Sequence, residues 1–284
     1  MLPGALQAMP PGDSGVPSSD PGSPAPGKPK PVELKPPGEE TILGRDLARD
    51  GLTGVIAFQR NSNKLLEITH LTIPGEEISH PGEPCRVDVV AREPIQTKSS
   101  GRPEGVSRYE VDIQACPFSL DVLEEAVLIT RAPQTCDFAA ADCRVDPTGL
   151  WGPLGSSIGP DQEKQFERER GRLESIMRGK FHALLASVGK DKNAIKKIAG
   201  EQAGFSSARE VTCHNYARED VHGFCALRIT QARALALQAA FADYAKEHAG
   251  ANAAKVTVKR SSKSVARPDA KSQTESSPET ELNR

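Results

Sequence analysis

REVTCHNYAREDVHGFCALRITQARAL, residues 209–235, carries two cysteines on either side of a turn between two helical segments. Cys213 lies late in the first segment and Cys225 lies at the start of the second, with eleven residues between them. Gly223 is a turn signal close to the second cysteine. This layout predicts a helical hairpin whose arms are joined by one covalent bond or by a bound metal ion.

The same turn contains the residue types of a zinc site, namely Cys213, His214, His222 and Cys225. Zinc fingers separate their two cysteines by about two to four residues and their two histidines similarly. Here the order is Cys-His, seven residues, His, two residues, Cys. On a helix, His214 also points about 100° away from Cys213. We therefore expect a disulfide, with no metal ion or other cofactor.

The chain has six cysteines and no C-x-x-C motif, which leaves many full pairings open. One cysteine opens the strand-like run CRVDVVA and another closes YEVDIQAC, so two neighbouring antiparallel strands would bring these two together. A further pair brackets the turn-prone run DFAAAD. The spacing thus predicts three local disulfides, namely Cys85–Cys116, Cys136–Cys143 and Cys213–Cys225.

Disulfides persist in oxidising compartments, so this pairing predicts a periplasmic or secreted protein. Residues 1–8, MLPGALQA, resemble the end of a secretory signal peptide with a cleavage site after Ala8. The alternative is six unpaired thiols in a cytosolic protein with an ordinary N-terminus. Counting reactive thiols under denaturing, non-reducing conditions separates the two.

Residues 161–250 have the apolar period of helices, and residues 41–150 read as strands. The helical part predicts one helix from Asp161 to Gly189, a second from about Asp191, and a third from Cys225 to His248, together a small antiparallel bundle. Five β-rich runs separated by turn residues predict a small antiparallel sandwich or barrel. These runs are 52–60, 65–73, 85–91, 109–116 and 124–130. Residues 151–160 read as a connection, and the fold class is α+β with two domains.

The two ends of the chain are poor in large apolar side chains. Residues 9–40 are rich in Pro, Gly and Ser, and residues 251–284 form a charged tail, so both are expected to be disordered. The net charge of −2 gives no footprint for nucleic acid. Apolar runs long enough for a transmembrane segment are absent from the sequence.

A few side chains are candidates for chemistry or for contact with a partner. The run 155–159, GSSIG, matches the G-x-S-x-G pattern of a nucleophile elbow, with Ser157 as the nucleophile. That elbow requires a strand turning into a helix within a parallel α/β sheet, and no such pattern surrounds it. Trp151 lies in a Gly/Pro loop and is either an exposed binding anchor or a side chain packed at the domain joint. The other candidate partner contacts are Asp142, Asp220 and His222.

Residues 161–241 resemble the LprI-like lysozyme-inhibitor family through the motif Arg209, Cys213, Cys225, Thr230 and Arg233. In that family an arginine precedes a cysteine on one helix, and a second cysteine opens a helix reading roughly C-x4-T-x2-R. Two family features are missing here, namely further cysteines near the first helix and an aromatic Trp before the arginine. The resemblance implies an exported, non-enzymatic domain, and some members bind and inhibit lysozyme.

The sequence therefore predicts a non-catalytic protein-binding module of the cell envelope, with a protein partner for which lysozyme is the candidate. A structural or scaffolding envelope protein is the alternative, and a serine hydrolase using Ser157 is the third hypothesis. A lysozyme cell-wall lysis assay separates the first two, and an active-serine probe tests the third.

Overall fold

The computed structural model describes residues 32–90 and 93–261, with side chains described up to residue 248. The described residues from Val32 onward belong to one compact unit. The signal remnant at 1–8, most of the Pro-rich linker at 9–40 and the end of the 251–284 tail lie outside the described residues.

Eleven antiparallel strands make up the β part. Eight of them close into a barrel in the order β2-β1-β11-β8-β7-β6-β5-β3, because β3 pairs again with β2. This confirms the barrel among the two expected architectures. The strands are β1 Asp46–Arg49, β2 Thr53–Arg60, β3 Leu66–Glu77, β4 Pro84–Asp88, β5 Ile95–Ser99, β6 Arg108–Val111, β7 Phe118–Leu123, β8 Ala126–Thr130, β9 Cys136–Phe138, β10 Cys143–Val145 and β11 Gly149–Gly152.

Strand β3 is twelve residues long and runs beyond the barrel. Its first half pairs with β2 and β5, and its second half pairs with β4 and β10. It continues through PGEE at 74–77, past the end of the run 65–73 expected from the sequence. Glycine is needed at position 75, because a Cβ there would lie 2.1 Å from the Arg144 carbonyl oxygen. The extension creates a small rim of strands, β4, β10 and β9, beside the closed barrel.

The barrel core is apolar and includes the single tryptophan. Trp151 is 0 % exposed, and its Nε1–H donates to the Pro147 carbonyl at 2.8 Å. Burial of the ring and a satisfied indole N–H are the normal arrangement for a core tryptophan. Trp151 is therefore not an exposed partner contact, which corrects one of the two sequence-based interpretations.

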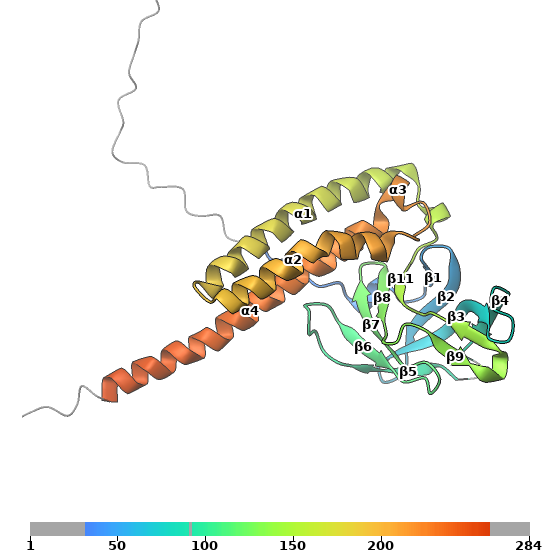
Figure 1. Cartoon of the computed structure of the whole chain (residues 1–284), viewed down its shortest axis with the longest axis horizontal. Helices are drawn as coiled ribbons and strands as arrows, with labels where there is room; N and C mark the ends of the chain where they lie inside the picture. Colours follow the sequence, from blue (N-terminus) through green and yellow to red (C-terminus); the bar gives the residue numbers. More distant parts are fainter. Residues whose placement is uncertain (1–31, 91–92, 262–284) are drawn as a thin grey trace, which may run out of the picture. The chain divides into compact units, whose positions relative to one another are not determined.

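The helical part consists of three long helices and one short turn (Figure 1). Helix α1 spans Pro160–Val188, α2 spans Lys192–Cys213, α3 spans Glu219–His222 and α4 spans Phe224–Ser261. Helix α1 begins one residue before Asp161, with Pro160 in its first turn. Asp191 caps α2 by accepting from the Asn193 and Ala194 N–H groups. The predicted bundle thus gains α3, and its last helix continues past His248 into the residues expected to be disordered.

The barrel has its own hydrophobic cluster and the helices have a smaller one, and a third cluster is shared between the two parts. Leu123, Ala126 and Leu150 of the barrel pack in this cluster with Phe166 and Phe224 of the helices. The connection after β11 is also tight, since a Cβ on Gly155 would lie 2.0 Å from the Ala217 carbonyl oxygen. The expected boundary between a 41–150 domain and a 161–250 domain therefore separates strands from helices, and both parts belong to one compact unit.

The chain from Val32 to residue 40 is ordered against the rest of the molecule, although its composition predicts disorder. Leu34 packs among the helices and Pro37 is buried. Glu39 makes an ion pair with Arg60 at 3.0 Å and accepts a hydrogen bond from Tyr109. These contacts with the rest of the molecule hold the segment in place, although its own composition is poor in apolar side chains. Among the described helices, none has an apolar stretch that would cross a bilayer.

Candidate functional site

The Cys213–Cys225 disulfide joins the end of α2 to the start of α4. Cys213 and Cys225 form a disulfide with a Cα–Cα distance of 5.5 Å, the pairing expected from the sequence. Both sulfurs are therefore unavailable to a metal ion. Each cysteine is buried among the apolar side chains of the shared cluster.

The other motif residues lie along the same seam between α2 and α4. The Arg209 Nη1 donates to the Thr230 hydroxyl at 2.8 Å and to the Glu174 carboxylate at 3.1 Å. Arg233 reaches back to α2, where its Nε donates to Gln202 at 3.2 Å. All five motif residues thus hold the helices together, and none of them forms an exposed recognition surface.

The turn between α2 and α4 is held by buried polar groups. Glu219 accepts from the Cys225 and Ala226 N–H groups at 2.9 and 2.8 Å, so it caps the start of α4. The His222 side chain is 0 % exposed, with Nε2 lying 2.8 Å from the Ala217 carbonyl oxygen and Nδ1 accepting from the Phe224 N–H at 3.1 Å. His222 is thus an internal brace, and its expected role as a partner contact is wrong.

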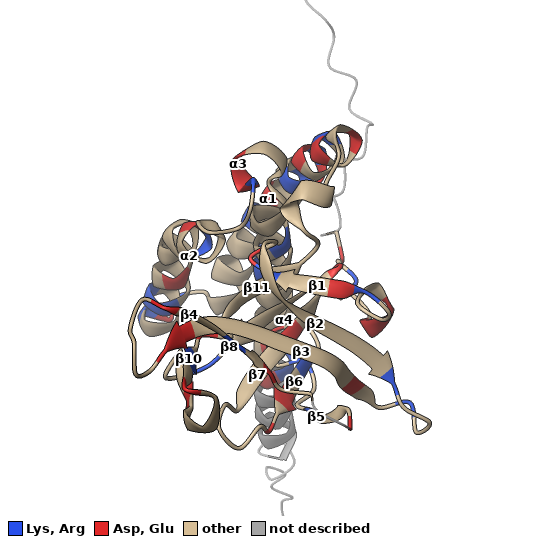
Figure 2. Cartoon of the chain, turned by 90° about the vertical axis from the view of Figure 1, so that its right-hand side faces the viewer, with Lys and Arg blue, Asp and Glu red and all other residues tan. Residues whose placement is uncertain are grey.

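Burial shifts the pKa values of Glu219 and His222 in this turn. Desolvation raises the pKa of the Glu219 carboxyl, although its two backbone hydrogen bonds oppose the shift. Desolvation lowers the pKa of the His222 imidazole, against the opposing effect of the Ala217 carbonyl. Asp220 remains exposed on α3, a helix whose acidic positions are coloured red along the ribbon in Figure 2. Asp220 is therefore available to a partner.

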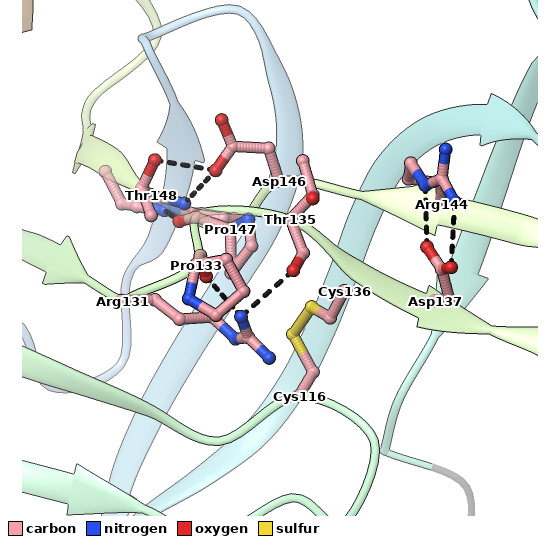
Figure 3. The surroundings of a disulfide bond; sticks show 11 residues. Cys116, Arg131, Pro133, Thr135, Cys136, Asp137, Arg144, Asp146, Pro147 and Thr148 are labelled. Carbon is pink, nitrogen blue, oxygen red and sulfur yellow. Dashed lines mark hydrogen bonds and ion pairs between the residues drawn. A yellow bond between two sulfur atoms is a disulfide. The ribbon is translucent and has the colours of Figure 1, made fainter.

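The other two disulfides differ from the expected ones. Cys85 pairs with Cys143 and Cys116 pairs with Cys136, at Cα–Cα distances of 5.8 and 5.5 Å. Figure 3 shows the second bridge beside Arg131 and Thr135. The predicted Cys85–Cys116 and Cys136–Cys143 bonds are wrong.

The strand pairing explains both corrections. Cys85 lies on β4, which pairs with β3, whereas the strand before Cys116 is β6, which pairs with β5 and β7. Within the β9–β10 hairpin, Cys143 lies opposite Phe138 and Cys136 lies opposite Val145. The two cysteines of that hairpin are therefore offset, and each faces another strand or loop instead.

A polar cleft of about 380 Å³ opens between the barrel and the end of α2, close to the Cys213–Cys225 disulfide. Its barrel wall includes Arg49, Asp50 and Asp146, and its helical wall includes Val211 and Asn215. Arg49 binds both carboxylates, at 3.8 Å from Asp50 and 3.4 Å from Asp146. Convergent charged groups beside a few apolar side chains, here Leu128, Ile129 and Val211, make this cleft a candidate ligand-binding site.

Asp50 is the unusual residue of this cleft. Its φ of 51° is in the left-handed region, which L side chains rarely adopt. Desolvation raises the pKa of its carboxyl, Arg49 opposes that shift, and Asp146 adds to it. A partly buried carboxylate held in a strained backbone costs stability, and such features concentrate at functional sites.

Asp146 is positioned by the loop that precedes β11. Its Oδ1 accepts from the Thr148 N–H at 2.8 Å and from the Thr148 hydroxyl at 2.6 Å. The two carboxylates and the Arg49 guanidinium together can bind a cationic or amide-bearing group. The sequence did not indicate Arg49 or Asp50, although Asp50–Gly51 is a turn signal.

The acidic residues of the 137–146 loop are not gathered in one place. Asp137 makes a two-bond ion pair with Arg144 at 2.7 and 2.9 Å, shown in Figure 3, which lowers the pKa of its carboxyl. Asp142 accepts hydrogen bonds from the Ser79 N–H and hydroxyl. Within the described residues, ligand atoms of Glu77, His80 and Asp142 lie within 4.8 Å of one another and are the side chains that could hold a metal ion.

Ser157 does not lie in a nucleophile elbow. It ends a one-turn 3-10 helix at Gly155–Ser157, and its hydroxyl donates to the Leu154 carbonyl at 2.7 Å. Every pairing between the described strands is antiparallel, and the one parallel contact is an isolated bridge between Leu43 and Phe58. The elbow belongs to a parallel α/β sheet. The motif match therefore lacks its structural context.

Comparison of the chain with protein-family models, with curated proteins and with solved structures gave no match. The resemblance to the LprI-like family remains a prediction from the motif.

Proposed function

We propose that this chain is a non-catalytic protein-binding module of the cell envelope, periplasmic or secreted, that resembles lysozyme inhibitors. One observation carries the proposal, namely that all six cysteines are used in three disulfides. Disulfides persist outside reducing compartments. Two of the disulfides stabilise the β part and the third joins α2 to α4. Such cross-links stabilise a small exported protein.

The groups available to a protein partner support binding to a cationic surface. Asp220 is exposed and Asp142 is partly exposed. The cleft adds the carboxylates of Asp50 and Asp146, beside Val211 and Thr212 of α2. Arginine and lysine side chains of a basic partner such as lysozyme would pair with the exposed Asp220, and at the cleft they would compete with Arg49 for Asp50 and Asp146. The exposed Val211 would supply an apolar contact.

A lysozyme cell-wall lysis assay tests the proposal directly. Purified chain added in excess should slow lysis, and Asp220→Asn should weaken that effect by up to about 5-fold, because a rim charge contributes up to about 1 kcal/mol. Asp243→Asn is the matched control, since Asp243 is exposed on α4 and far along the chain from Asp220. Unchanged lysis at excess chain would remove lysozyme as the partner.

The oxidised state is tested separately by thiol counting. The denatured, unreduced protein should contain no thiol that reacts, because every cysteine is paired. Six reactive thiols would contradict an exported module.

The length of α4 favours a scaffold as the second candidate function. It has 38 residues, against 29 in α1 and 22 in α2, so at about 1.5 Å per residue it extends beyond its neighbours, as Figure 1 shows. An extending helix can contact a second envelope component. Co-sedimentation of the chain with the envelope fraction, together with unchanged lysis, would favour this function.

A further inference from the structure

The segment Val32–Leu34 has no regular secondary structure and lies against α1 and α4, and its hydrogen bonds to these helices are made by its backbone. The Leu34 N–H donates to Gln238 Oε1 at 2.9 Å, and Gln238 Nε2 donates to the Leu34 carbonyl at 2.9 Å. One side-chain amide thus satisfies both backbone groups of one residue. A neighbouring β-strand binds an extended peptide in the same way.

Lys180 makes the third polar contact with this segment. Its Nζ donates to the Val32 carbonyl at 2.8 Å and to Gln238 Oε1 at 2.6 Å. The residue is only 8 % exposed, and desolvation lowers the pKa of its amine while Glu33 opposes the shift. A buried ammonium requires acceptors, and the Val32 carbonyl is one of the two that Lys180 has here.

The side chains of the segment show what the groove selects. Leu34 packs against the helical clusters that contain Met177, Leu184 and Leu237. Val32 is about half exposed, at 51 %, and Glu33 is exposed. The groove therefore accepts one apolar side chain and otherwise binds only main-chain groups. Selection by one pocket and affinity from main-chain hydrogen bonds are the marks of a peptide-binding site.

We propose that the groove formed by Lys180 of α1 and Gln238 of α4 is a binding site for an extended peptide with one leucine-like side chain, and that Val32–Leu34 is its built-in ligand. The segment blocks the groove in the free chain. The competing ligand is the same segment from a second copy of this chain, which fits because its chemistry is identical. This inference does not depend on the proposed partner or compartment.

Because the segment Val32–Leu34 is attached to the barrel, it competes strongly with any free peptide for the groove of its own chain. Glu39 is held by Arg60 and Tyr109, five residues after Leu34. A short tether of this kind keeps a ligand at an effective concentration in the millimolar range. A free peptide therefore binds weakly to the wild-type chain and well to a chain whose own segment has been released.

The test uses the full chain and a fluorescein-labelled peptide, VELKPPG, that copies residues 32–38. Leu34→Asp should release the segment, because a carboxylate does not fit among apolar side chains. Fluorescence anisotropy should show the peptide binding to this variant at least about 10-fold more tightly than to the wild type. Adding Gln238→Ala to the variant should weaken binding at least about 5-fold, and the peptide VEDKPPG should not bind.

A second measurement keeps the proposal testable if Leu34→Asp fails to fold. Hydrogen exchange of the Leu34 amide in the wild-type chain should accelerate at least about 5-fold when millimolar VELKPPG displaces the segment, and VEDKPPG should leave it unchanged. The proposal is overturned if a folded Leu34→Asp chain binds the peptide no better than the wild type. Exchange unaffected by the peptide in the wild type would overturn it equally.

Discussion

Arg209 of α2 and Thr230 of α4 are joined by a hydrogen bond of 2.8 Å next to the Cys213–Cys225 disulfide. Thr230 is fully buried, and its hydroxyl donates in turn to the Ala226 carbonyl at 2.6 Å. The two helices are therefore fixed by a covalent bond and by a charge-assisted hydrogen bond within about two turns of each other. These residues of the Arg209–Arg233 motif therefore have a structural role, which is to hold α2 against α4.

Replacing Thr230 by Val should lower the free energy of unfolding by about 1–2 kcal/mol, because Arg209 loses a buried acceptor while the shape is kept. Urea denaturation of the oxidised protein measures the change. Thr212→Val is the matched control, since Thr212 is partly exposed on α2 and bonds only the Ala208 carbonyl. Equal losses for the two variants would show that the Arg209 contact adds nothing.

The disulfides should differ in the stability that each one provides. The bridges Cys85–Cys143, Cys116–Cys136 and Cys213–Cys225 close loops of 58, 20 and 12 residues. Loop-closure entropy then predicts losses of about 4, about 3 and about 3 kcal/mol when each pair is changed to serine. Double serine variants measured in urea give the order.

The connectivity itself is checked by mass spectrometry of an unreduced digest. Peptides that contain Cys85 should be linked to those that contain Cys143, and Cys116 should be linked to Cys136. Recovery of a Cys136–Cys143 link would contradict the strand register described above.

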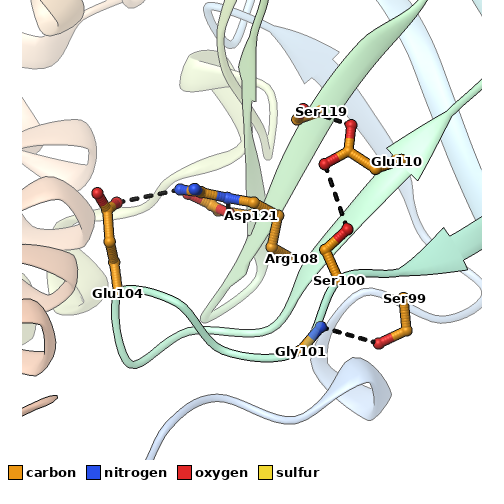
Figure 4. A network of polar contacts seen from close by, with 8 residues as sticks. All are labelled: Ser99, Ser100, Gly101, Glu104, Arg108, Glu110, Ser119 and Asp121. Carbon is orange, nitrogen blue, oxygen red and sulfur yellow. Dashed lines mark hydrogen bonds and ion pairs between the residues drawn. The ribbon is translucent and has the colours of Figure 1, made fainter. Parts of the chain in front are cut away.

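The general fold could be predicted because local patterns fix it. The five β-rich runs correspond to β2, β3, β4, β6 and β8, and the change of period after Pro160 marks the helices. Strand β7 was missed because its sequence FSLDVL carries a charge in a buried strand. Figure 4 shows how that charge is satisfied, with Asp121 accepting two bonds of 2.7 Å from Arg108.

The cleft and the disulfide connectivity could not be predicted, because both depend on closure of the barrel. Asp50 and Asp146 are almost one hundred residues apart, and only the pairing of β1 with β11 brings their ends together. Cys85 and Cys143 likewise meet only because β3 extends to contact both β4 and β10. The spacing of residues along the chain does not indicate that Asp50 lies near Asp146 or that Cys85 pairs with Cys143. The Cys213–Cys225 bridge could be predicted because its cysteines are close in sequence.

Asp50→Asn should stabilise the protein at neutral pH by about 0.5–1 kcal/mol, because it removes a largely buried charge. Asparagine also tolerates the left-handed backbone at this position. The folded-state pKa of Asp50 is raised above 3.8, so the folded state binds the proton more readily and stability falls as pH rises through that window.

The gain of Asp50→Asn should therefore shrink on acidification toward pH 4 in urea titrations. The control is Asp46→Asn, because Asp46 is exposed on β1. A loss of stability at pH 7 for Asp50→Asn would show that the pairing with Arg49 outweighs the cost of burial.

His222 should make the fold sensitive to mild acid. Its hydrogen bonds require the neutral ring, with the proton on Nε2 facing the Ala217 carbonyl and the bare Nδ1 facing the Phe224 N–H. Burial lowers the pKa of the folded imidazole below 6.5. As pH falls below about 6.5 the unfolded chain binds this proton first, so the free energy of unfolding should fall.

The His222→Gln variant isolates that effect when its unfolding is compared with the wild type between pH 5 and pH 8. Glu219, whose pKa is raised above 4.5, acts in the opposite direction, so the difference between the two proteins is the informative quantity. We expect the wild type to lose more stability than the variant below pH 6.5. His214→Gln is the control, because His214 is exposed in the same turn. Parallel pH profiles for the wild type and His222→Gln would mean that the His222 ring binds its proton as readily in the folded chain as in the unfolded chain.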